Sequence, residues 1–125
     1  MNSNNDVVAE YFRCVNDEDW TAFAELWTDD AELIALGARP RNGKEDVLGY
    51  YAKIFTPWRE HYDEATRVLV ADSAITVEVH FSGVTGDGTP VEFDAIDLFD
   101  FVDGEISRLS NWYDVMAARK AIGMT

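Results

Sequence analysis

The chain has 125 residues, of which 24 are acidic, 10 are basic and 47% are apolar, with a formal net charge of −14. This length and apolar content predict a single folded domain spanning residues 1–125. The negative charge repels phosphate backbones and anionic membrane surfaces, so we expect neither nucleic acid nor a membrane as a partner.

Cys14 is the only cysteine, and a lone thiol forms no internal disulfide, which is compatible with a reducing compartment. It lies inside a helical pattern without a flanking His or Lys, so we interpret it as small buried filler. The sequence shows no signal-peptide pattern and no run of about 18 apolar residues. We therefore expect a soluble, cytoplasmic protein.

Apolar side chains recur at helical spacing in three segments of the first half of the chain. The first helix is expected from Asp6, its N-cap, to Val15, and the second from its cap Asp19 to Trp27. The third is expected from Lys44 to Phe55. Tyr11 lies on the apolar stripe of the first helix, where it is either a core residue or a functional one.

Less regular segments surround the third helix. A short strand is expected at 31–36 and a turn-rich loop at 37–43. A connection broken by Pro57 follows at 56–62. This connection is either a staple over the core or a pocket lid, and we favour the staple because His61 within it has no visible partner.

The second half of the chain predicts an antiparallel sheet, with hairpin signals at Asp72-Ser73, Gly86–Gly88 and Asp103-Gly104. His80 lies on the polar face of one of these strands and is interpreted as a surface or interface residue. Asp114 is expected to cap a terminal helix from Val115 to Ile122. The expected strands are 65–71, 75–84, 91–102 and 105–113.

One strand carries an isolated carboxyl on an apolar face. Side chains alternate along a strand, so Asp97 interrupts a row that is otherwise apolar: Val91, Phe93, Ala95, Phe99 and Phe101. Burial among such residues raises the pKa of a carboxyl unless a cation or N–H donors compensate. Asp97 is therefore either a functional residue or a carboxyl satisfied by the fold.

No strong motif for metal, phosphate or nucleophilic chemistry is present in the sequence. It lacks a Gly-rich phosphate loop, a Cys/His metal spacing and a G-x-S-x-G elbow. We expect no metal and no cofactor, so any chemistry falls to carboxyls, tyrosines and the shape of a pocket.

Three segments carry a resemblance to a known family: Trp27–Ala31 (WTDDA), Pro40–Gly43 (PRNG) and Asp94–Phe99 (DAIDLF). In order and spacing they resemble segments of ketosteroid isomerase, whose close relatives are the SnoaL-like polyketide cyclases. The expected order of three helices and a curved sheet also resembles the cone-shaped α+β fold of the nuclear transport factor two-like superfamily. This resemblance covers nearly the whole chain.

The resemblance implies roles for three polar residues. Asp97 falls where ketosteroid isomerases keep a protonated aspartic acid in their oxyanion hole, and Tyr11 matches the tyrosine that shares this hole. Tyr51 matches a tyrosine that supports it. In that family an apolar site holds the carboxylic acid neutral so that it donates a hydrogen bond.

Two departures from these families narrow the chemistry. The general-base aspartate of the isomerase aligns with Ala35, which cannot carry a proton. The Asp-Arg-Asp set of limonene epoxide hydrolase needs a carboxylate where this chain has Asn111. Three candidates for the base remain. They are His61, a water molecule bound to Asn111, and a group of the substrate itself.

We therefore expect a conical α+β domain with catalytic Tyr11 and Asp97 in a hydrophobic pocket. Its expected ligand is a hydrophobic small molecule bearing a carbonyl or hydroxyl, processed by isomerisation, cyclisation or dehydration. The alternative, favoured by Ala35, is a noncatalytic ligand-binding or dimer-forming module.

The resemblance also implies a homodimer through an outer sheet face carrying Thr76, Glu78, His80 and Arg108. The expected substrate-binding residues are Tyr51, Val77, Val79, Phe93, Ala95, Phe99, Leu109, Asn111 and Tyr113.

Overall fold

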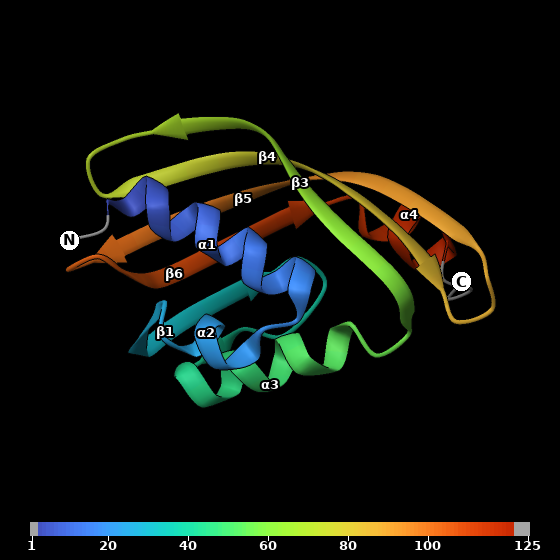
Figure 1. Ribbon diagram of the computed structural model, residues 1–125, viewed down its shortest axis with the longest axis horizontal. Coiled ribbons are helices and arrows are strands. Elements are labelled where there is room, and N and C mark those ends of the chain that lie inside the picture. The colour runs from blue at the N-terminus through green and yellow to red at the C-terminus, as the bar shows by residue number, and fades with distance from the viewer. Residues whose placement is uncertain (1–2, 122–125) are drawn as a thin grey trace.

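The computed structural model describes residues 3–121, which form an α+β fold around one six-stranded sheet in the order β2-β1-β6-β5-β4-β3. Figure 1 shows the curved sheet bending around α1, with α2 and α3 to one side of that helix. The predicted cone-shaped α+β class is confirmed. The elements are α1 (Asn4–Asp17), α2 (Trp20–Ala24), β1 (Trp27–Ala35), β2 (Arg41–Asn42), α3 (Lys44–Ile54), β3 (Trp58–Val70), β4 (Ala74–Thr85), β5 (Pro90–Val102), β6 (Glu105–Tyr113) and α4 (Val115–Ala121).

Helix α1 begins earlier than predicted because its N-cap is Ser3. The Asp6 backbone N–H donates to Ser3 Oγ at 3.1 Å, and the Ser3 backbone N–H donates to the Asp6 carboxylate at 3.2 Å. The prediction that Asp6 is the cap is wrong, since Asp6 instead completes a capping box. Cys14 is fully buried on this helix, as predicted.

Helix α2 is shorter than predicted, although Asp19 caps it as expected through a 3.2 Å bond from the Ala22 N–H. It ends before Trp27, which opens β1 and pairs with Ile106 of β6. The Leu26 carbonyl accepts the Ile106 N–H at 2.7 Å, so sheet pairing replaces the helical bond that the apolar spacing suggested.

The segment 56–62, predicted as a loop, contains the start of strand β3. Its residues pair with β4, for example His61 with Gly83, and a register shift near Trp58 disturbs the alternation by which a strand is recognised. At Gly83 a Cβ would lie 2.8 Å from the Glu60 carbonyl oxygen. Glycine therefore permits the close approach that β3 makes to β4.

The sheet is mixed rather than wholly antiparallel. Neighbouring strands from β3 to β6 pair antiparallel, but β1 and β6 run parallel, with Leu33 opposite Leu109 and Ala35 opposite Asn111. A parallel pair requires a long crossover, and here α3 and β3 to β5 lie between the two strands in the chain. The predicted antiparallel sheet is wrong for this one pair.

The sheet has an inner face, which packs against α1 to α3, and an outer face. Register places Val77, Asp97, Asn111 and Ala35 side by side across β4, β5, β6 and β1 on the inner face. Thr76, Glu78, His80 and Arg108 belong to the outer rows, as predicted. A register shift at Asp100 brings both Ile106 and Leu109 inward, which explains why neither row of β6 is wholly apolar in the sequence.

The last helix, α4, follows β6 directly. The Ala117 N–H donates to Asp114 Oδ1 at 2.9 Å, which confirms Asp114 as its cap. The structure describes the helix as far as Ala121, and the predicted last residue, Ile122, lies outside the described residues.

Candidate functional site

Two buried tyrosines from different helices meet on the inner face. Tyr11 of α1 and Tyr51 of α3 are 4% and 5% exposed, and their hydroxyls share a hydrogen bond of 2.6 Å. The Tyr11 ring packs edge-on against Phe99 at a centroid distance of 4.9 Å. Burial raises the pKa of both phenols well above the ordinary 10, so they stay neutral hydrogen-bond donors at physiological pH.

Asp97 lies on the same face, 4% exposed, in strand β5. Burial raises the pKa of its carboxyl from 3.8 to about 6, while the hydrogen bond that the Asn111 amide donates to it opposes this rise. The direction of the shift is the one that the sequence predicts. That hydrogen bond favours the charged form of Asp97, burial favours the neutral form, and the carboxyl therefore passes between the two forms near pH 6.

The carboxyl and the two phenols form one electrostatic unit. The negative charge of Asp97 raises the pKa of both Tyr11 and Tyr51. Helices α1 and α3 and strand β5 thus place two phenol hydroxyls and one carboxyl against the same aromatic core. The structure brings together the polar residues that the sequence singles out, namely Tyr11, Tyr51, Asp97 and Asn111.

The expected lining residues divide into a sealed group and a group that solvent reaches. Val77, Val79, Phe99 and Leu109 are buried, whereas the inner-face residues Phe93, Ala95, Asn111 and Tyr113 are only half-buried. Phe93 stacks on Tyr113 with centroids 5.6 Å apart. Solvent therefore reaches the inner face within a few residues of the buried Asp97.

A second inner carboxyl, Asp63, escaped the sequence interpretation. It lies on β3 opposite Phe81 and is half-buried between exposed neighbours Tyr62 and Glu64. Burial raises the pKa of Asp63 from 3.8 to about 7, and the charge of Asp97 adds to the rise. The alternation of His61 and Asp63 is the sequence signal that places Asp63 on the inner face. An interpretation of 56–62 as an irregular connection misses this signal.

His61 also lies on the inner row of β3 and has a partner, contrary to the prediction. Its Nε2 is 3.0 Å from Glu18 Oε2, and its ring stacks on Phe55 with centroids 4.2 Å apart. The side chain is 4% exposed. Within residues 3–121, neither His61 Nδ1 nor the Trp27 indole N–H has a hydrogen-bond partner, so two buried polar atoms border this core unsatisfied.

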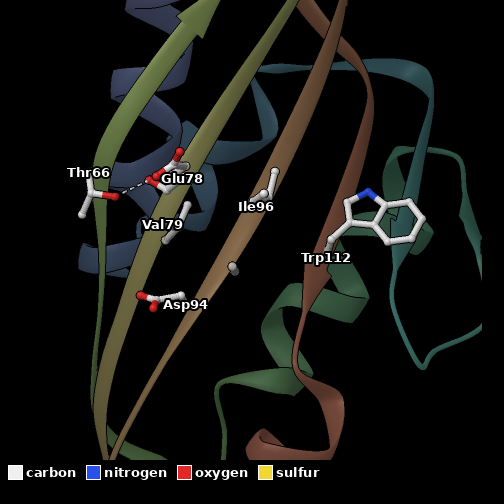
Figure 2. A pocket seen from close by; sticks show the side chains of 7 residues that line it. Thr66, Glu78, Val79, Asp94, Ile96 and Trp112 are labelled. Atoms are coloured by element: carbon white, nitrogen blue, oxygen red, sulfur yellow. Dashed lines mark hydrogen bonds between the residues drawn. The ribbon is translucent and has the colours of Figure 1, made fainter.

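A surface hollow of about 450 Å³ lies mainly on the outer face (Figure 2). Thr66, Glu78, Asp94, Ile96 and Trp112 contribute most of its wall, and inner-row Val79 and Ala95 complete it. Figure 2 shows the Thr66 hydroxyl donating to the Glu78 carbonyl and the Trp112 indole standing to one side. This hollow is distinct from the expected pocket around Asp97.

The histidine of the outer face, His80, is paired with two carboxylates. His80 lies 2.8 Å from Asp94 and 2.9 Å from Glu92, and these hydrogen bonds raise the pKa of its imidazole. Across the described range 3–121, no three His, Cys, Asp or Glu side chains are grouped to hold a metal ion. No helix within that range is long and apolar enough to cross a membrane.

Residues 8–109 match the family model of the SnoaL-like domain. No curated protein sequence matches the chain significantly. Many solved structures share the fold, among them a protein from Jannaschia sp. CCS1 described as a SnoaL-like polyketide cyclase, 20% identical over 98% of this chain and 92% of that one, with a TM-score of 0.87.

Two further structures show the same fold. A protein from Catenulispora acidiphila DSM 44928 with a ketosteroid isomerase-like fold, solved with trimethylamine, is 16% identical over 95% of this chain and 93% of that one, with a TM-score of 0.85. An epoxide hydrolase from M. tuberculosis, similar to limonene epoxide hydrolase, is 17% identical over 95% and 88%, with a TM-score of 0.80. At these identities the likeness concerns the fold.

Proposed function

The chain belongs to the SnoaL-like domain family, and from this premise we propose that it is an enzyme acting on a hydrophobic small molecule with a carbonyl or hydroxyl group. The reaction class is isomerisation, cyclisation or dehydration. The names of its structural neighbours, which include a SnoaL-like polyketide cyclase and a protein with a ketosteroid isomerase-like fold, support cyclisation and isomerisation.

The observation that carries the proposal is the buried pair Tyr11–Tyr51 beside Asp97. The Tyr51 hydroxyl, 2.6 Å from that of Tyr11, fixes the position of Tyr11. The charge of Asp97 raises the pKa of both phenols, and burial pushes the Asp97 carboxyl itself toward protonation. A fold needs none of these groups for packing, since phenylalanine and leucine fill the same space. Such clusters of shifted groups are typical of functional sites.

In the proposed mechanism, Tyr11 and protonated Asp97 donate hydrogen bonds to a substrate oxygen that gains negative charge in the transition state. Losing one such donor commonly costs about 2.7 to 4 kcal/mol of transition-state stabilisation. Tyr51 orients Tyr11, and Asn111 orients Asp97. The substrate enters past half-buried Phe93, Ala95 and Tyr113 and packs against the apolar inner rows.

The test uses 2-tetralone, a bicyclic ketone whose oxygen accepts hydrogen bonds and donates none. Calorimetric titration would be done above and below the pKa of Asp97, about 6, in the wild type, Tyr11→Phe and Asp97→Asn. Wild-type binding should weaken as Asp97 ionises, and Tyr11→Phe should bind about tenfold more weakly, or about 1.4 kcal/mol. Asp97→Asn should lose the pH dependence. Identical titrations in all three proteins, or no binding, would refute the oxygen site.

The second candidate, favoured by Ala35, is a noncatalytic binding module. Ala35 is 5% exposed next to Asn111, and it offers no proton acceptor where the isomerases resembled by this chain have one. Such a module binds bicyclic ketones stoichiometrically and never turns them over. Deuterium exchange of the α protons of bound 2-tetralone, followed by NMR in heavy water, separates the two candidates, because a binding module leaves the exchange rate at that of the buffer.

We also propose that the outer face forms a homodimer. Ile96 and Trp112, which are adjacent across β5 and β6, are 45% and 52% exposed on that face. A chain of charge −14 repels its copy, so added salt should strengthen the dimer. Light scattering of the wild type and of Trp112→Arg tests this, and a wild-type monomer at micromolar concentration in high salt would contradict it.

A further inference from the structure

A cation from strand β2 reaches the inner face of the sheet beside α3. Arg41 lies directly opposite Leu33, a buried core residue of β1, so the Arg41 side chain belongs to the inner row. Its guanidinium carbon is 4.9 Å from the centroid of the Tyr50 ring of α3. A guanidinium at this distance over a ring is attracted to it, and the contact holds the cation in one place.

One tyrosine ring separates Arg41 from the oxygen site. The Tyr50 ring meets that of Tyr51 edge-on at a centroid distance of 5.9 Å, and the Tyr51 hydroxyl is 2.6 Å from that of Tyr11. Direct contacts therefore connect the guanidinium to the phenols. Burial raises the pKa of Tyr50, the charge of Tyr113 adds to this rise, and the charge of Arg41 opposes it. The half-buried Tyr113 thus borders the same ring.

The charge of Arg41 is not neutralised by an acid of the fold. Within residues 3–121 its Nε has no hydrogen-bond partner, and its guanidinium forms no ion pair. Asp46, an acid on the first turn of α3, is held instead by the Asn42 backbone N–H at 3.1 Å and by Arg39 at 3.5 Å. Because buried donors are normally paired, an arginine fixed on a ring with a buried N–H to spare suggests a ligand that supplies the acceptor.

The net charge of −14 does not prevent an anion from binding at this point. Exposed charges are screened over about 8 to 10 Å at physiological ionic strength, whereas a half-buried cation in contact with a ligand is screened much less. Arg41 is half-buried, so it dominates the potential that a ligand group beside it experiences. A carboxylate is the group that matches its planar fork of N–H donors.

We propose that Arg41 binds a carboxylate of the substrate, which makes the substrate a hydrophobic ketone with an acid group at the end opposite its carbonyl. This inference rests on the proposed function, because the oxygen site holds the other end of the molecule. The rings between the two ends pack on half-buried aromatic side chains such as Tyr113. Attachment at both ends fixes the direction in which the substrate lies. No bond forms or breaks at Arg41, which sets specificity.

The experiment is a calorimetric comparison of 6-carboxy-2-tetralone with its methyl ester, which has the same rings and ketone without the charge. At about pH 5 Asp97 is largely protonated and the aromatic acid is ionised. The proteins are the wild type, Arg41→Gln and the matched control Arg39→Gln, which removes the same charge from a side chain that is 65% exposed.

The wild type should bind the acid about tenfold more tightly than the ester, as a charge-assisted bond requires. Arg41→Gln should bind the two equally, and Arg39→Gln should keep the wild-type preference. Affinity for 2-tetralone, which has no acid group, should be the same in the wild type and Arg41→Gln. Equal binding of acid and ester by the wild type, which needs no variant, overturns the inference. A preference that survives in Arg41→Gln, or equal weakening of all three ligands there, overturns the assignment to Arg41.

2-Naphthoate, which has the carboxylate but no ketone, separates this inference from the proposed function. It should bind the wild type and Tyr11→Phe alike and bind Arg41→Gln about tenfold more weakly. That result without any binding of 2-tetralone would refute the oxygen site and leave Arg41 as an anion site. Binding of 2-tetralone with neither 2-naphthoate binding nor a preference for the acid would refute the role of Arg41 and leave the oxygen site standing.

Discussion

The two faces of the sheet treat the same residue type in opposite ways. Asp94 and Asp97 lie three residues apart on β5, and because side chains alternate they lie on opposite faces. Asp94 is exposed and bonds His80, whereas Asp97 is 4% exposed and bonds the neutral amide of Asn111. Position parity along one strand thus decides whether a carboxylate is a solvated ion-pair partner or a group with a raised pKa.

The contrast extends to the rest of each face. On the outer face acids meet cations, as in Arg67–Glu78 at 2.9 Å. On the inner face Asp63 and Asp97 meet aromatic rings, an amide and each other's charge. Because burial raises the pKa of the inner carboxyls, ionising them at neutral pH lowers the stability of the fold. The exposed outer carboxyls are solvated and have no such effect. The following experiments test that difference.

The largest effect is expected from truncating an inner aromatic residue. Phe99 is fully buried and packs against Tyr11, so Phe99→Ala should lower the free energy of unfolding by about 3 to 5 kcal/mol. The matched change Val102→Ala on the same strand, at a side chain 54% exposed, should cost less than about 1 kcal/mol. Urea unfolding measures both, and similar losses would remove the distinction between the faces.

The pH dependence of stability should be dominated by the inner face. Asp97 binds its proton more tightly in the folded state than in the unfolded chain, so stability falls as pH rises from about 4 through about 6. At about 1.4 kcal/mol per pKa unit, the loss attributable to Asp97 is about 3 kcal/mol. In urea unfolding at several pH values, Asp97→Asn should make this fall shallower by about that amount and leave the part that the raised pKa of Asp63, about 7, contributes over the same range. A parallel profile for wild type and variant would refute the buried titration.

A smaller effect is expected from removing one phenolic hydroxyl. Tyr11→Phe deprives the buried Tyr51 hydroxyl of its partner and should cost about 1 to 2 kcal/mol in urea unfolding. The control Tyr62→Phe changes a side chain that is 55% exposed on the outer face, and it should have no measurable effect. A neutral Tyr11→Phe would show that the tyrosine pair does not tie α1 to α3.

The smallest effect belongs to the outer face. Hydrogen bonds to Asp94 and Glu92 raise the pKa of His80, so its contribution is complete below the unfolded value of 6.5 and is lost as pH rises through the higher folded value. His80→Gln should therefore be slightly less stable than wild type in acid and equal to it in alkaline solution. Equal differences at both ends of the pH range would contradict this sign.

The sequence by itself determined the elements with strong local signals. Helical spacing located α1 and α3, hairpin turns separated β4, β5 and β6, and the alternation of β5 singled out Asp97 as the polar member of an apolar row. These features depend on residues close together in the chain. Parity also grouped Asn111 with Leu109 in one row of β6, but the resemblance to a known family, and not parity, turned that row inward.

Tertiary structure decided what depends on residues far apart in the chain. The parallel pairing of β1 with β6 joins Ala35 to Asn111 across 76 positions, which no local pattern reveals. The extension of β3 through 58–64 follows from its pairing with β4, because register shifts spoil its alternation. That pairing turns Asp63 inward, where its burial depends on α1 and its electrostatics on Asp97. Burial and long-range charge exist only in the folded chain, so the second carboxyl emerged from the structure alone.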